Sequence, residues 1–262
     1  MENTLPSFQA AIDCGCDAVE LDVFLLKCGT LVVFHGDGND ATPGWLADYC
    51  GVCGSILDYT YEETKSLKFN PWCLELSVCP AQKLEQATIP TLAQVLELAK
   101  KTGIFVKIEL KGPDTEEPTL ELVERMDMVR QVSFSSFFHD RVARIRQLRP
   151  QRYPDGTYIY KTACLFSDPL PINFLNISKF VGASEVHLKY DTCTKERIDA
   201  IHQAGMGTMA WFRGPIGMRQ DATLKYVDVG NEDAIMYSVV LRTGVRSLCV
   251  NRPDILSSMF TQ

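Results

Sequence analysis

Two acidic residues, Glu20 and Asp22, stand two positions apart inside the apolar segment AVELDV of residues 18–23. Side chains of a β-strand alternate between its two faces, so both carboxylates would project the same way, about 7 Å apart. Buried carboxylates on one face repel each other unless a cation or a base holds them together. The pair therefore points to a divalent metal site, and the alternative is a half-exposed strand with an ordinary polar face.

Other residues with ligating or catalytic side chains lie in apolar runs of the same kind. In VKIELK, residues 106–111, the alternating positions are Lys107, Glu109 and Lys111, which share one face of a strand. Charges at every second position of a central strand are costly unless they serve a site, whereas on an edge strand they would be ordinary. Three further polar or aromatic residues end apolar runs: His35, Trp211 and Asn251. Acids, a histidine and lysines together would fit metal-assisted chemistry on a phosphate.

Strand-like and helix-like patterns alternate along the whole chain. Patterns typical of strands cover residues 18–23, 31–35, 104–111, 132–137, 158–165, 184–188, 207–212 and 247–251. Helical periodicity covers residues 4–14, 91–101, 119–129, 141–148, 195–205 and 233–243. This alternation predicts a parallel sheet with crossover helices, and the number of units suits a TIM-type (β/α)8 barrel. In such a barrel the carboxyl ends of the strands form the mouth, where the polar residues above would meet.

The 262-residue chain is long enough for one large domain, and no Pro/Gly/Ser-rich linker divides it. We therefore expect a single domain over residues 1–262, with residues 36–88 as a long excursion after the second strand. Four of the cysteines lie in this excursion: Cys50, Cys53, Cys73 and Cys79. The spacing of the second pair is wrong for a zinc ribbon.

The net charge of −7 argues against nucleic acid as the main partner, although it leaves room for a small anionic substrate. No signal-peptide pattern opens the sequence, and no apolar run approaches the length of a transmembrane segment. The ten cysteines are then expected to be reduced thiols of a cytoplasmic protein. A peripheral contact with a membrane surface is compatible with this expectation.

Several other charged residues are expected to be structural. Arg141, Arg144, Arg146 and Arg149 are spaced as a solvated face of one helix. His187 lies in a strand-like run, and we expect a buried histidine with satisfied hydrogen bonds there.

The chain also resembles the glycerophosphodiester phosphodiesterase family, through a set of short motifs in the family's order between residues 2 and 254. The matching segments are Glu2-Asn3-Thr4 with Phe8, Glu20-Leu21-Asp22-Val23, Val32-Val33-Phe34-His35, Ile89-Pro90-Thr91-Leu92, Lys107-Ile108-Glu109-Leu110-Lys111, Ser135-Ser136-Phe137 and Asn251-Arg252-Pro253-Asp254. Each motif alone is weak, but the ordered set is specific.

The resemblance implies a TIM-type barrel that binds one divalent cation, Mg²⁺ or Ca²⁺, through three carboxylates. These fall on Glu20, Asp22 and Glu109. An all-oxygen ligand set favours Mg²⁺ or Ca²⁺ over zinc or copper.

The resemblance also implies roles for residues around the metal. His35 falls on the family's second histidine, a general acid or base. Lys111 falls on the lysine that contacts the phosphate, and Trp211 on an aromatic residue that packs against the alcohol part of the substrate. We expect Asn251, which opens the last motif, to bind substrate as well.

The implied activity is metal-dependent hydrolysis of glycerophosphodiesters to glycerol 3-phosphate and an alcohol. A lysophospholipase D or sphingomyelinase-D-like activity, with a lysophospholipid as substrate, is the alternative within enzymes. The family's first strand, which ends in His-Arg-Gly shortly before the Glu-Asn-Thr motif, has no counterpart in this sequence. We expect a truncated reading of a longer enzyme, and the alternatives are a defective homologue and a non-catalytic barrel used for binding.

Overall fold

The computed structural model describes residues 1–36, 43–70, 87–212, 219–220, 223–224 and 232–260. Within them one eight-stranded sheet has the order β10-β7-β6-β5-β4-β3-β1-β2. Its strands are β1 (Ala18–Leu25), β2 (Leu31–Val33), β3 (Phe105–Leu110), β4 (Val132–Ser136), β5 (Thr162–Phe166), β6 (Glu185–Lys189), β7 (Gly207–Trp211) and β10 (Ser247–Cys249). Two short strands, β8 (Arg219–Gln220) and β9 (Thr223–Leu224), form a separate antiparallel pair.

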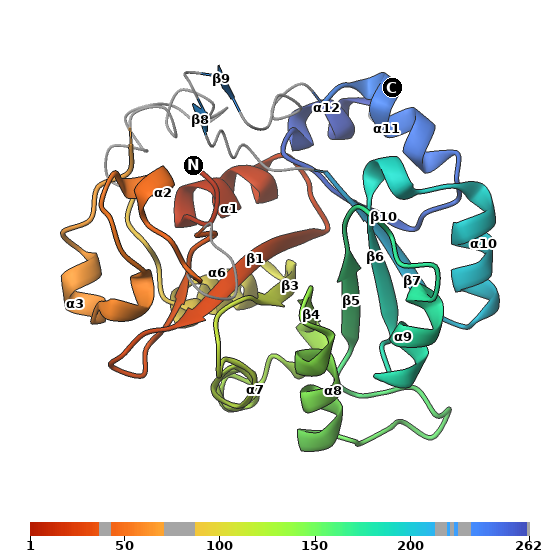
Figure 1. Cartoon of the computed structure of the whole chain (residues 1–262), viewed down its shortest axis with the longest axis horizontal. Helices are drawn as coiled ribbons and strands as arrows, with labels where there is room; N and C mark the ends of the chain where they lie inside the picture. Colours follow the sequence, from red (N-terminus) through yellow and green to blue (C-terminus); the bar gives the residue numbers. More distant parts are fainter. Residues whose placement is uncertain (37–42, 71–86, 213–218, 221–222, 225–231, 261–262) are drawn as a thin grey trace.

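All neighbouring strands of the large sheet are parallel except β1 and β2, which form an antiparallel hairpin. The sheet is strongly curled, and Figure 1 shows the crossover helices on its outer side. The main helices are α1 (Leu5–Asp13), α6 (Leu92–Thr102), α7 (Glu116–Arg125), α8 (His139–Leu148), α9 (Phe174–Phe180), α10 (Lys195–Gln203), α11 (Ala234–Leu241) and α12 (Pro253–Ser258). The predicted parallel α/β architecture of TIM type is confirmed.

The alternation of side chains along β1 and β3 separates the core from the site. Val19, Leu21 and Val23 belong to one hydrophobic cluster, together with the apolar face of α6. Glu20 and Asp22 therefore point to the opposite, inner face of the curled sheet. In the parallel pairing of β1 with β3, Glu20 lies beside Lys107 and Asp22 beside Glu109.

Helix α6 shows how local sequence sets the helices that cover the sheet. The Thr91 hydroxyl accepts a hydrogen bond from the Gln94 backbone N–H at 3.2 Å, and the Gln94 side chain accepts one from the Thr91 backbone N–H at 2.8 Å. The helix ends at Gly103, which takes a left-handed conformation with φ of 79°. The predicted helix at residues 91–101 is confirmed within one residue at each end.

The excursion at residues 36–88 contains more regular structure than its sequence indicates. Its described part holds α2 (Ala47–Cys50), a 3₁₀ turn (Ile56–Asp58) and α3 (Tyr61–Thr64). Buried residues of this part join Phe24 and Phe34 in a third hydrophobic cluster at the ends of β1 and β2. Cys73 and Cys79 lie outside the described residues. Outside this excursion, helices α9 and α12 were not predicted from the sequence either.

At Gly112 the backbone that follows β3 packs closely against β1. Its N–H donates to the Val23 carbonyl at 2.9 Å, and an added Cβ would lie 2.9 Å from the Phe24 Cα. Only glycine therefore allows β1 and the end of β3 to approach this closely.

No helix in the described part of the chain combines the length and apolarity needed to cross a bilayer.

Replacing Leu96 by alanine tests the packing of α6 on the sheet. Leu96 is fully buried, so we expect Leu96→Ala to lower the free energy of unfolding by about 2–5 kcal/mol. Leu98→Ala, at a partly buried position of the same helix, serves as the matched control and should cost clearly less. Equal losses of stability in denaturant unfolding of the two variants would contradict this packing.

Candidate metal and active site

Three carboxylates meet on the inner face of the sheet, two from the middle of β1 and one from the carboxyl end of β3. Each of Glu20, Asp22 and Glu109 offers an oxygen atom, and these oxygens lie within 4.8 Å of one another. Asp22 and Glu109 are 3% and 7% exposed, and Glu20 is partly buried. We call this group the carboxylate cluster.

Crowding raises the pKa of two members of the cluster. Removal from solvent raises the pKa of Glu109 to about 8, and the negative charge of Asp22 adds to the effect. The pKa of Glu20 is also raised well above its ordinary value, first by desolvation and then by the charges of Asp22 and Glu109. The cluster therefore binds protons tightly in the absence of a cation.

Neighbouring groups partly offset this negative charge. The Lys111 Nζ lies 3.4 Å from the Asp22 Oδ1, and the charges of Lys111 and Arg141 both act to lower the pKa of Glu109. Asn3 donates from its Nδ2 to the Asp22 Oδ2 at 2.8 Å and accepts the Asp22 backbone N–H at 3.2 Å. Asn3 takes a positive φ of 54°, which asparagine tolerates better than most residues.

The position of Asn3 follows from the start of helix α1. Thr4 is the N-cap of this helix, and its hydroxyl donates to the Met1 carbonyl at 2.7 Å. This hydrogen bond folds residues 1–3 back toward β1, so that the Asn3 side chain reaches Asp22.

His35 follows Phe34, whose backbone N–H donates a hydrogen bond to the Asp22 carbonyl at 3.0 Å. Its Nδ1 is 2.6 Å from the hydroxyl of Tyr49, and that hydroxyl donates to the Glu2 Oε1 at 2.6 Å. The side chains of His35 and Glu2 are each 21% exposed, so the histidine is open to a small substrate.

Lys107 forms a second polar group on the inner face, one pleat before Glu109. Its Nζ is 2.8 Å from the Glu185 Oε2, which also accepts a hydrogen bond from the His187 Nε2 at 2.9 Å. Although burial acts to raise the pKa of Glu185, the hydrogen bond and charge of His187 and the ammonium of Lys107 hold that pKa well below its ordinary value. Burial lowers the pKa of His187, and its contact with Glu185 acts in the opposite direction. His187 is buried as expected, but the expectation that its hydrogen bonds are satisfied is wrong for one ring nitrogen: among the described residues, Nδ1 has no hydrogen-bond partner.

Trp211 and Asn251 lie at the ends of β7 and β10. The Trp211 Nε1 donates to the Phe166 carbonyl at 3.1 Å, and its ring packs edge-on against Phe137 at 5.6 Å between centroids. The Asn251 backbone N–H donates to the Glu232 carboxylate at 2.9 Å, and its side-chain amide donates to the same carboxylate. Trp211 thus offers an aromatic surface at the mouth, while Asn251 is held by Glu232.

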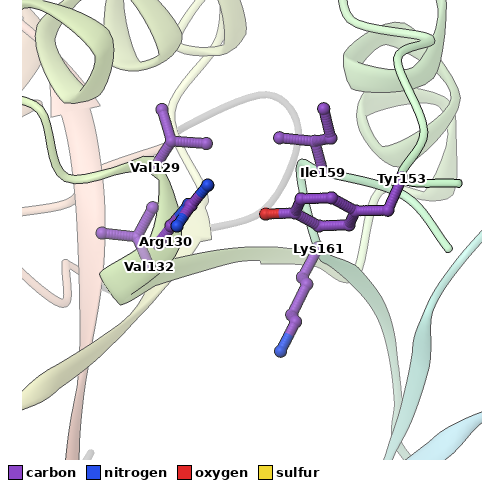
Figure 2. A pocket seen from close by; sticks show the side chains of 6 residues that line it. All are labelled: Val129, Arg130, Val132, Tyr153, Ile159 and Lys161. Atoms are coloured by element: carbon purple, nitrogen blue, oxygen red, sulfur yellow. The ribbon is translucent and has the colours of Figure 1, made fainter.

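A different cavity lies at the start of β4, away from the carboxylate cluster. It has a volume of about 330 Å³ and, as Figure 2 shows, is lined by Val129, Arg130, Val132, Tyr153, Ile159 and Lys161. Because Val132 opens β4 and Lys161 directly precedes β5, this cavity lies at the amino ends of these strands. It contains no carboxylate, so it lacks the groups needed for cation chemistry.

The carboxylate cluster fits a hard divalent cation. Its donors are all carboxylate oxygens, and burial together with the neighbouring negative charges raises the pKa of Glu20 and Glu109. A divalent cation would replace the bound protons and leave the three groups ionised. Oxygen ligands of this kind suit Mg²⁺ or Ca²⁺.

Comparison with known proteins places this site in a family. The model of the glycerophosphoryl diester phosphodiesterase family matches residues 1–255. A glycerophosphodiester phosphodiesterase of Bacillus altitudinis is 34% identical over 211 residues, which are 77% of this chain and 76% of that protein.

Solved structures show the same fold. A candidate glycerophosphodiester phosphodiesterase from Galdieria sulphuraria superposes with a TM-score of 0.78 at 23% identity, over 100% of this chain and 92% of that one. A phosphodiesterase from Oleispira antarctica, solved with sn-glycerol-3-phosphate, gives a TM-score of 0.75 at 20% identity and the same coverage.

The TIM-type fold and these matches define a phosphoric diester hydrolase of the glycerophosphodiester phosphodiesterase type. The chain belongs to the glycerophosphodiester phosphodiesterase family. The acidic cluster predicted from the strand patterns is consistent with the divalent-metal site typical of this family.

Sequence reasoning missed several residues around the site. Arg141 was expected on a solvated helix face, yet it follows β4 at the mouth and influences Glu109. Arg146 was expected on that face too, but it is 8% exposed and donates to the Gly182 carbonyl at 2.7 Å, before the amino end of β6 and away from the site. Arg141 lies in the first turn of α8, the helix that follows β4, and this place near the carboxyl end of a strand was the available signal. Nothing local indicates that Tyr49 meets His35.

The raised pKa of Glu109 predicts a pH-dependent stability of the metal-free protein. Between the ordinary value of 4.5 and about 8, the unfolded chain has released a proton that the folded protein keeps. Stability should therefore fall as pH rises through this window, by on the order of a few kcal/mol. A divalent cation needs the ionised carboxylates, so Mg²⁺ or Ca²⁺ should raise the Tm more at about pH 8 than at about pH 5.5.

Thermal unfolding with EDTA or with added cation at both pH values measures this effect. Glu109→Gln should reduce the pH dependence to the part that Glu20 contributes, and it should abolish the cation-induced rise in Tm. Glu121→Gln, at an exposed position of α7, is the matched control and should behave as the wild type. A cation effect that is equal at both pH values, or that survives in Glu109→Gln, would contradict the assignment.

Proposed function

We propose that this protein is a metal-dependent phosphodiesterase that cleaves glycerophosphodiesters to glycerol 3-phosphate and an alcohol. The observation that carries the proposal is the carboxylate cluster on the inner face of a TIM-type sheet, with Lys111 beside it. The product found in the Oleispira antarctica phosphodiesterase supports the choice of substrate.

In this proposal Glu20, Asp22 and Glu109 hold one Mg²⁺ or Ca²⁺ ion. When bound, the cation would neutralise charge on the phosphate oxygens and stabilise the negative charge that develops in the transition state. The three carboxylates would supply the oxygen ligands that hold such a cation at the inner face of the sheet. Lys111 adds a positive charge on the same side, since its ammonium already lies 3.4 Å from Asp22.

His35 is the proton-transfer group of the proposal. Histidine changes protonation near neutral pH and suits a general acid or base for the attacking oxygen or the leaving alcohol. The ring is partly exposed and lies next to the end of β2, close to the strand that carries Asp22. Trp211 and Phe137 would line the alcohol side of the substrate, and Asn251 would contribute to substrate binding from the end of β10.

A lysophospholipase D activity is the second candidate, and one observation favours it. Phe137 is 38% exposed and packs on Trp211, so the mouth carries apolar surface that an acyl chain could contact. Comparing turnover of lysophosphatidylcholine with turnover of glycerophosphocholine separates the two candidates. Faster cleavage of the lysophospholipid would make it the substrate class.

Release of glycerol 3-phosphate from glycerophosphocholine by the native full-length protein tests the leading proposal. We expect activity that EDTA abolishes and that Mg²⁺ or Ca²⁺ restores. Glu109→Gln and Lys111→Met should each lower kcat/KM by roughly 10²-fold or more, because each removes a charge that stabilises the transition state. His35→Ala should lower kcat by roughly 10²–10⁴-fold.

Lys161→Met is the matched control for Lys111→Met, since Lys161 borders the cavity at the other end of the strands (Figure 2). Its activity should equal that of the wild type. Activity that resists EDTA, or that is retained in Glu109→Gln, would refute the proposed metal-dependent mechanism.

A further inference from the structure

The ring of His35 is held by a hydroxyl group from the excursion at residues 36–88. Tyr49, in helix α2, places its Oη 2.6 Å from the His35 Nδ1 and 2.6 Å from the Glu2 Oε1. The His35 Nδ1 itself lies 3.4 Å from the same Glu2 oxygen. Three groups that are far apart in sequence thus form one short chain: Glu2, Tyr49 and His35.

The proton inventory of this chain fixes the state of the histidine. A carboxylate can only accept hydrogen bonds, and a phenol has one proton to donate. With the Tyr49 hydroxyl donating its hydrogen bond to an ionised Glu2, the Tyr49 oxygen is left to accept a hydrogen bond from an Nδ1–H of His35. In the neutral ring the Nε2 is then the unprotonated nitrogen, which can take up a proton and return it.

We infer that Tyr49 is a positioning residue: its hydroxyl, anchored on Glu2, holds His35 in the Nδ1–H tautomer and makes Nε2 the proton-transferring atom. This inference rests on the proposed role of His35 as general acid or base. It extends that role to a residue of the excursion, outside the strands that carry the carboxylate cluster.

The surroundings of Tyr49 make its hydroxyl a fixed partner. Tyr49 is 1% exposed, and its ring packs edge-on against Phe34 at 5.4 Å between centroids. Its carbonyl accepts the Asn70 N–H at 2.7 Å, while Leu46 and Ile56 of the same cluster are fully buried. A buried ring with two rotatable bonds keeps its hydroxyl in place at little entropic cost.

The same arrangement would stabilise the protonated ring. When Nε2 takes up a proton, the positive imidazolium faces the Tyr49 oxygen and the Glu2 carboxylate through its Nδ1–H. Hydrogen bonds to a charged group are stronger than neutral ones, so this support increases as the charge develops. A carboxylate behind a catalytic histidine acts in this way in hydrolytic triads, and here a phenol lies between the two groups.

Tyr49 could instead serve only to pack the excursion against β2. That reading predicts that removing the hydroxyl changes stability alone. The tautomer of His35 separates the two readings, because a purely structural hydroxyl has no effect on which ring nitrogen carries the proton.

Ring ¹⁵N NMR of the native full-length protein measures the tautomer directly. The sequence contains four histidines, so the signal that disappears in the His35→Ala variant is that of His35. We expect a neutral His35 with its proton on Nδ1 in the wild type and a mixture with the Nε2–H form in Tyr49→Phe. In turnover of glycerophosphocholine, Tyr49→Phe should lower kcat by roughly 10- to 100-fold, the size expected for a lost hydrogen bond to a charged group, with little change in KM.

Tyr61→Phe is the matched control, because the Tyr61 hydroxyl donates to the Gln94 side chain at 3.2 Å on the same excursion, away from His35. In Tyr61→Phe, neither the tautomer of His35 nor kcat should change. A wild-type His35 with its proton on Nε2 overturns the inference whatever the activity, and so does a Tyr49→Phe variant with wild-type tautomer and kcat. A wild type without phosphodiesterase activity would refute the proposed function, while the tautomer would still decide the role of Tyr49.

Discussion

The mutual repulsion of three carboxylates is the constraint on which the rest of the site depends. Oxygens of Glu20, Asp22 and Glu109 lie within 4.8 Å of one another, in surroundings largely removed from solvent. Burial first, and this repulsion second, raise the pKa values of Glu20 and Glu109. Protons can relieve the repulsion, but only a cation relieves it and leaves all three groups ionised. Asn3 and Lys111 reduce the cost of the arrangement, because the Asn3 amide donates to one oxygen of Asp22 and the Lys111 ammonium lies 3.4 Å from the other.

The fold imposes this arrangement through strand register. Asp22 pairs with Glu109 across β1 and β3, while Val23 and Leu21 project into the cluster formed with α6. A slip by one residue would bury the acids among apolar helix side chains and expose the apolar face, so the register is strongly specified. The same periodicity places Lys107 one pleat deeper, where its contact with Glu185 supplies a compensated charge pair on the inner face. Core and site are thus two faces of the same strands.

The features that depend on local pattern could be predicted from the sequence. The pattern of apolar residues predicted the strands. The acids in these strands predicted the carboxylate cluster, because polar residues of neighbouring parallel strands meet at the mouth of a barrel. Helix boundaries were less certain: α7 was expected at residues 119–129 but spans Glu116–Arg125, since Pro118 is tolerated in a first helical turn. Contacts between segments that are distant in the chain could not be predicted from the sequence. The hydrogen bond between Tyr49 and His35 is the clearest case. Nothing in the sequence near either residue encodes a partner 14 positions away.

The claim that the carboxylate cluster binds one divalent cation is tested most directly by anomalous scattering from crystals of the native protein grown with Mn²⁺ as a substitute for Mg²⁺. The account predicts one strong peak between Glu20, Asp22 and Glu109, with an oxygen of each carboxylate at a coordination distance of roughly 2.0–2.6 Å. The same crystals of Glu109→Gln should lose the peak. An absence of density between the three carboxylates in the wild type, or a cation bound only elsewhere, would contradict the account.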